Sequence, residues 1–88
     1  MELKIASRTV TDEQGRRRRF HYSLLVNQVE AGSFSCEDYG VGVREEGGGS
    51  ARIPGITTSA MRIDELMTLL VDNKVGPASL ADVVADWL

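Results

Sequence analysis

Four consecutive arginines, Arg16–Arg19, form the densest cluster of like charge in this 88-residue chain. Guanidinium groups bind phosphates and carboxylates through paired N–H donors, so the run suggests a site for nucleic acid, another anion or an acidic protein. In a strand, however, successive side chains point to opposite faces, so at most two of the four share a surface. Asp12 and Glu13 lie across a predicted turn and can neutralise part of the run. Nucleic-acid binding is therefore disfavoured, since it normally needs a broader basic surface with aromatic platforms.

The residues that follow the arginines alternate between apolar and polar types, which predicts a strand over 16–29 with one polar face. Only Leu25 breaks this alternation. We place the candidate interaction surface on the polar face, at Arg17, Arg19, His21 and Arg44.

Cys36 and His21 are the only candidates for a nucleophile and its general base. Such a pair needs mutual contact, a group that orients the base and an oxyanion site. A lone cysteine is more often a small core residue. One histidine, one cysteine and scattered carboxylates do not make a metal site with three or four ligands. We therefore expect no catalytic, metal-binding or cofactor-binding residues, no cofactor and no enzyme, with a small Cys36-dependent enzyme as the weakest candidate.

Alternation and turn residues predict strands over 2–10 and 16–29, a third strand from Phe34 and a short fourth strand at 51–53. In the third strand the apolar side chains change parity, which predicts a bulge near Glu37–Asp38. Gly47–Gly49 lacks the Lys-Ser/Thr of a phosphate loop and no helix follows it directly, so it fits a hairpin tip. Pro54 cannot donate to a strand ladder, so the fourth strand should lie at an edge or end there.

The last thirty residues have helical periodicity, which predicts helices from about 59 or 60 to 73 and from about 80 to the last residue. Ser79 and Asp82 resemble a capping box before the second helix. Helices this short are not stable alone in water and must lie on another surface.

The predicted fold is therefore a single α+β domain over 1–88: an antiparallel three- to four-stranded meander (1–57) with two C-terminal helices (58–88) packed on one face. The predicted core is Leu3, Ile5, Phe20, Tyr22, Leu24, Val26, Val41, Val43, Ile63, Leu66, Met67, Leu70, Leu80, Val83, Val84 and Trp87.

Composition is that of an ordinary globular chain, with 42% hydrophobic and 26% charged residues and a net charge of −3. The predicted helical part carries two basic residues against five acidic ones, which discourages phosphate on that side. No apolar run approaches the roughly 18 residues of a membrane helix, and the N-terminus lacks the apolar centre of a signal peptide. With a single cysteine, these features predict a cytoplasmic protein without a membrane partner.

Three segments have a recognisable pattern: the Tyr-Gly-Val-Gly-Val run at 39–43, Ile-Thr-Thr-Ser at 56–59, and the ending from 75 to 88. They resemble a family of small uncharacterised proteins, a domain of unknown function from Gram-positive anaerobic bacteria. Gly76 and Trp87 stand where the family pattern has Ser and Phe. The resemblance covers roughly 39–88, implies a bacterial cytoplasmic origin and assigns no catalytic residue.

These observations favour a non-enzymatic protein-interaction or regulatory module, whose partner is an unidentified protein or a second copy in a homodimer. The alternative is nucleic-acid or anion binding through Arg16–Arg19.

Overall fold

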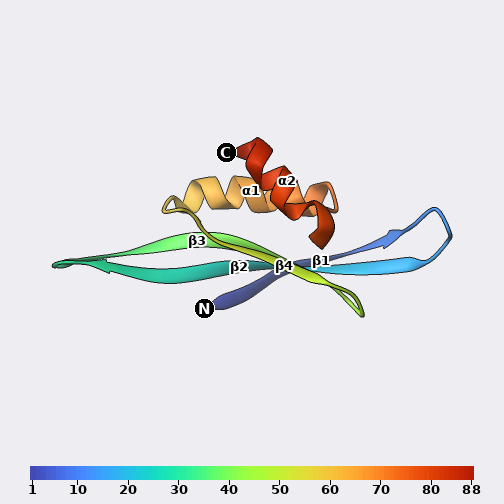
Figure 1. The fold of residues 1–88 in the computed structure, drawn as a ribbon, viewed down its shortest axis with the longest axis horizontal. Helices are drawn as coiled ribbons and strands as arrows, with labels where there is room; N and C mark the ends of the chain where they lie inside the picture. The colour runs from blue at the N-terminus through green and yellow to red at the C-terminus, as the bar shows by residue number, and fades with distance from the viewer.

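The computed structural model describes the backbone of residues 1–88 and the surroundings of every side chain except that of Ala31. Four strands come first: β1 (Glu2–Thr11), β2 (Arg17–Ala31), β3 (Phe34–Glu45) and β4 (Ser50–Thr57). The helices follow: α1 (Ala60–Asp72), the short 3₁₀ helix η1 (Pro77–Ser79) and α2 (Leu80–Trp87). The strands form one antiparallel sheet in the order β1-β2-β3-β4, and both α-helices lie on one side of it (Figure 1). The predicted α+β meander with two C-terminal helices is confirmed.

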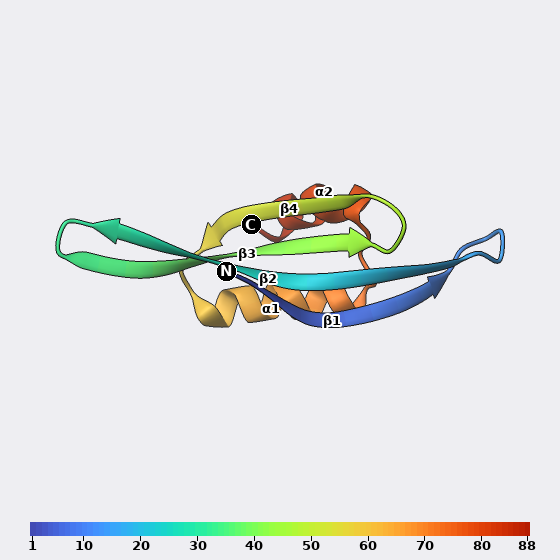
Figure 2. The ribbon, with the colours of Figure 1, turned by 90° about the horizontal axis from the view of Figure 1, so that it is seen from below.

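The sheet is much longer than the helices that cover it. The molecule measures 54 × 24 × 17 Å, and the β1–β2 and β2–β3 hairpins project beyond the helices in opposite directions (Figure 2). The helices cover only the middle of one sheet face. We call the opposite face, which carries no helix, the open face.

The core lies between the middle of the sheet and the two helices. Ser59 begins α1, and its hydroxyl accepts a hydrogen bond from the backbone N–H of Arg62 at 3.2 Å. The predicted capping box at Ser79 is wrong, because the Ser79 side chain makes no capping bond and η1 leads into α2 instead. The largest fully buried side chains are Tyr22, Val41, Val43, Leu66, Leu70 and Leu80.

Two predicted core residues near the N-terminus are exposed. Leu3 is 44% exposed and Ile5 is 51% exposed. The β1–β2 register shifts between Lys4 and Ala6, which leaves Ile5 as an extra residue in β1. Ala6 therefore takes the position opposite Tyr22 and packs against the core. The strand bulge accounts for Ile5. Leu3 lies before the bulge, opposite Leu24 on the helix side, and is exposed on the edge strand.

Four further predicted core residues are half-buried rather than buried: Leu24, Val26, Val83 and Trp87.

The predicted bulge at Glu37–Asp38 is wrong. β2 pairs with β3 without a register shift, from the Phe20–Glu45 pair to the end of the hairpin. Phe34 and Cys36 therefore lie on the open-face side, while Tyr39 lies on the helix side. This part of the hairpin extends beyond the helices, so no core requires its apolar side chains to share one face (Figure 2). The irregularity lies instead in β4, which is an edge strand as Pro54 predicted.

Tyr22 joins the sheet to the connection between α1 and η1, because its buried hydroxyl donates a hydrogen bond to the Val75 carbonyl at 3.0 Å. Burial raises the pKa of the Tyr22 phenol. Above about pH 10 an unfolded tyrosine ionises while the native phenol keeps its proton, so the free energy of unfolding should fall as pH rises there.

We expect Tyr22→Phe to cost about 1–3 kcal/mol at pH 7, since it leaves the Val75 carbonyl without its donor. The variant should also lose part of the fall in unfolding free energy above about pH 10. Denaturant unfolding from pH 7 to 11 measures both, with Tyr39→Phe as the matched control.

Candidate functional site

The open face brings together all four residues of the sequence-based interaction surface. The register places His21 directly opposite Arg44 on β3 and opposite Ser7 on β1. Arg17 and Arg19 follow on the same face of β2. Figure 2 views the sheet from below and shows that no helix covers this side. Four residues that come from two strands therefore share one accessible surface.

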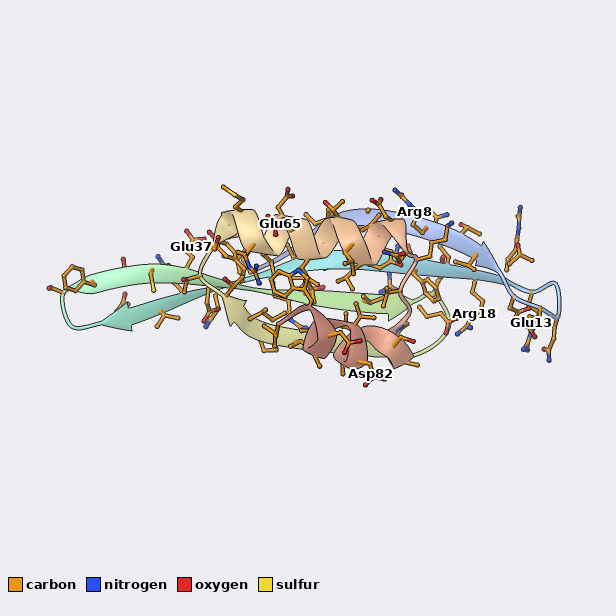
Figure 3. All side chains as sticks on the ribbon, turned by 90° about the horizontal axis from the view of Figure 1, so that it is seen from above. Arg8, Glu13, Arg18, Glu37, Glu65 and Asp82 are labelled. Carbon is orange, nitrogen blue, oxygen red and sulfur yellow. The ribbon has the colours of Figure 1, made fainter. Side chains whose placement is uncertain are left out.

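The arginine run itself is divided between the two faces. Arg18 lies on the helix side, where its guanidinium is 5.6 Å from the centroid of the Phe20 ring and pairs with Glu45 (Figure 3). Hydrogen bonding to Arg18 lowers the pKa of the Glu45 carboxyl. Arg16 Nε is 3.3 Å from Asp12 Oδ2. The pKa of Asp12 is also lowered, chiefly because its carboxylate accepts the Arg16 backbone N–H.

On the open face, the Arg19 guanidinium has a hydrogen-bond partner and an ion-pair partner, whereas within the described structure the Arg17 guanidinium has no carboxylate partner. Arg19 Nη1 donates to the Thr9 hydroxyl at 3.1 Å, and Arg19 Nε lies 3.8 Å from Glu46 Oε2. Among the side chains that the structure describes, neither Arg17 nor Arg44 has a carboxylate within 4 Å. Exposed ion pairs such as Arg19–Glu46 contribute little to stability and exchange partners easily.

His21 is held in place by both of its ring nitrogens. Nδ1 is 2.9 Å from the Ser7 hydroxyl, and Nε2 is 3.5 Å from Glu46 Oε2. The side chain is only 11% exposed. His21 therefore forms part of the floor of this face, while the longer arginines rise above it.

A shallow hollow of about 340 Å³ lies at the centre of the open face. Two adjacent rows of paired residues on neighbouring strands line it. The first row is Lys4, Ser23, Gly42 and Arg52, and the second row contributes His21, Arg44 and Ser50. Gly42 contributes no side chain, so the floor is low in the middle and cationic side chains stand on both sides. The lining of the hollow includes more basic than acidic side chains, and the hydroxyl groups of Ser23 and Ser50 can donate hydrogen bonds.

An ion pair spans the hollow beside these rows. Arg52 Nη2 on β4 lies 2.9 Å from Glu2 Oε1 on β1. The two side chains reach each other above β2 and β3, where Leu25 faces the open side. The stem of Arg52 passes over Gly42, next to Leu25. This cover explains why Leu25 is only 7% exposed although no helix lies on its face.

Comparison with protein families gives one match, a family model that covers residues 1–88. The chain belongs to DUF6514, a family of unknown function. The match extends over the whole chain, beyond the segments that carried the resemblance in the sequence. No curated protein and no solved structure matches it. Membership of DUF6514 therefore assigns no activity, and the chemistry has to be argued from the residues themselves.

In this DUF6514 chain, Cys36 and His21 lie far apart. Cys36 is exposed near the tip of the β2–β3 hairpin, unlike most lone cysteines, which lie in the core. His21 lies opposite Arg44 on β3. Arg44 is eight residues beyond Cys36, so the histidine and the cysteine are roughly 25 Å apart along the extended strand. The histidine cannot act as a base for this thiol in the folded chain. The described residues also contain no group of three or more His, Cys, Asp or Glu that could hold a metal ion.

Glu2, Lys4 and Arg52 also line this hollow, and no pattern along a single strand indicates them. Their places follow from the register of four strands, which no single segment specifies. One signal was present in the sequence: Gly40 and Gly42 share the parity of Arg44, which marked a stripe without side chains on that face.

No helix in the described part of the chain is long and apolar enough to cross a membrane.

Proposed function

We propose that this protein is a non-enzymatic interaction module that binds an acidic segment of a partner protein on its open face. The observation that carries the proposal is the basic hollow at the centre of an uncovered sheet. Its volume, about 340 Å³, lies at the lower end of the range for ligand pockets. A hollow of this size holds one or two acidic side chains rather than a large cofactor.

The distribution of charge supports an acidic partner. The open face carries five basic side chains, at Lys4, Arg17, Arg19, Arg44 and Arg52, against the three carboxylates of Glu2, Asp38 and Glu46. Residues 58–88 have the opposite balance, with two basic and five acidic residues. Glu65 and Asp82 illustrate this on the outer surfaces of the helices (Figure 3). Such a charge difference orients an incoming acidic surface toward the open face before contact.

Nucleic-acid binding through Arg16–Arg19 has less support. Three of the four arginines have carboxylate partners, and the run is split between two faces. If the alternative held, an oligonucleotide would bind with an affinity that falls steeply with salt concentration.

A titration with a capped hexaglutamate peptide tests the proposal, with a hexaglutamine peptide as the neutral control. Replacing the two open-face arginines that lack carboxylate partners, Arg17→Gln with Arg44→Gln, should weaken binding at least tenfold, since charge-assisted hydrogen bonds contribute about 1.5–3 kcal/mol each. The matched control is Arg8→Gln with Lys74→Asn, which removes the same net charge away from the open face. NMR shifts or calorimetry give the affinity. Equal loss in both double variants, or tighter binding of a DNA oligonucleotide, would contradict the proposal.

A second copy is the other partner expected from the sequence, and the homodimer remains a prediction. Light scattering on the same samples, with and without peptide, gives the mass that tests it. We further propose that the protein works in the cytoplasm of a Gram-positive anaerobic bacterium. The support for this is the family resemblance and the single cysteine.

A further inference from the structure

The ion pair between Glu2 and Arg52 shows which chemistry the hollow accepts. It places a carboxylate over a basic surface, 2.9 Å from a guanidinium nitrogen. Both partners stay accessible, because the Glu2 side chain is 47% exposed and the Arg52 side chain is 64% exposed. An exposed pair of this kind contributes only about 0–1 kcal/mol, so an external carboxylate can replace Glu2 at low cost.

We propose that Glu2 is an internal competitor that occupies the carboxylate position of the hollow until an acidic partner segment displaces it. This inference rests on the proposed function and adds the position, the ligand group and the residue that regulates affinity. Arg52 is the primary anchor of the incoming carboxylate. Lys4 and Ser23, in the same row of the sheet, supply the second cation and a hydroxyl donor.

The geometry of the row suits an extended acidic segment. Lys4 on β1 and Arg52 on β4 are separated by three strand spacings, roughly 14 Å. Both side chains are long enough to lean inward over Ser23 and Gly42 from opposite edges. A Cβ at position 42 would lie 3.6 Å from Cγ of Arg52, so the Arg52 stem passes close to Gly42 on the open face. The Arg52 side chain is 64% exposed, so a carboxylate that enters from the open side can reach its guanidinium.

The competitor has a clear signature: its removal strengthens binding. Glu2→Gln should raise affinity for hexaglutamate about two- to fivefold, which is the range expected from loss of an exposed ion pair. The matched control is Glu65→Gln, which removes the same charge from an exposed position on α1 (Figure 3). Arg52→Gln should weaken binding about tenfold or more. In the Arg52→Gln background, Glu2→Gln should give no further gain, because the competitor acts through Arg52.

Calorimetric titration of hexaglutamate into the wild-type chain and these four variants measures the five affinities, and thermal unfolding confirms that each variant is folded. The inference is supported only if the gain from Glu2→Gln exceeds that from Glu65→Gln and disappears without Arg52. If wild-type binding depends on Arg17 and Arg44 but neither Glu2 nor Arg52 changes it, this inference fails and the proposed function stands. Absence of any binding to the wild-type chain overturns both.

Discussion

Gly40→Ala should destabilise the protein by about 3 kcal/mol or more, although it adds a single methyl group. A Cβ at this position would lie 2.2 Å from the Ile53 carbonyl oxygen and 2.6 Å from the Pro54 Cα. Both are backbone atoms of β4, so no side-chain rotation can relieve the contact and the edge strand must move away. Overpacking against atoms that cannot rearrange costs about 1–3 kcal/mol or more. For a domain of this size that corresponds to a fall in Tm of roughly 12 °C or more.

Gly42→Ala is the matched control for this prediction, two residues further along the same strand. Its Cβ would meet the Arg52 side chain at 3.6 Å and Leu25 at 3.8 Å, which are ordinary contacts. We expect a change within about 0.5 kcal/mol, or a small gain, since alanine loses less backbone entropy than glycine on folding. Thermal and urea unfolding of the two variants measures the difference. Equal stability of the two would mean that β4 does not pass over Gly40 as the structure has it.

The sequence contained enough information for the layers of this fold but not for the irregularities within its strands. Helical periodicity after Ser59 and alternation between Phe20 and Val26 each reflect burial against a partner layer, and both patterns were interpreted correctly. Ile5 was assigned to the core because alternation assumes a regular strand, and the bulge in β1 broke that assumption. Cys36 and Phe34 show the converse case. Beyond the helices no layer selects a face, so their parity carried no information about burial.

The same distinction applies to the candidate site. Alternation along β2 alone places Arg17, Arg19 and His21 on one face, so these residues could be predicted. The hollow needs Lys4 and Arg52, which are 48 positions apart in the sequence and are brought into one row only by three successive strand registers. Leu25 shows why the register matters. Its break in alternation is visible in the sequence, but its burial depends on the Glu2–Arg52 ion pair, which joins the two edge strands.

Leu80→Ala should be the most damaging change in α2, with a cost of about 3–4 kcal/mol. Leu80 is fully buried, whereas Trp87 at the other end of α2 is half-buried against the core, with the Arg62 guanidinium 4.2 Å from its ring centroid. Truncation of a fully buried tryptophan costs about 3–5 kcal/mol. At its observed exposure, we expect Trp87→Ala to cost about 2 kcal/mol, including the stacking with Arg62.

The reason for this order is the length of α2. Eight residues cannot form a stable helix alone in water, so α2 exists only while it is docked. Leu80 and Val84 are its buried contacts, and loss of Leu80 removes the one at the start of the helix. Leu80→Ala should therefore lower the unfolding free energy and also weaken protection of the α2 amides from hydrogen exchange, while the sheet amides keep most of theirs. Leu88→Ala, at a position that is 74% exposed, should change neither quantity. A larger loss from Trp87→Ala than from Leu80→Ala would show that α2 is anchored by its last turn, and the docking described for this helix would then be wrong.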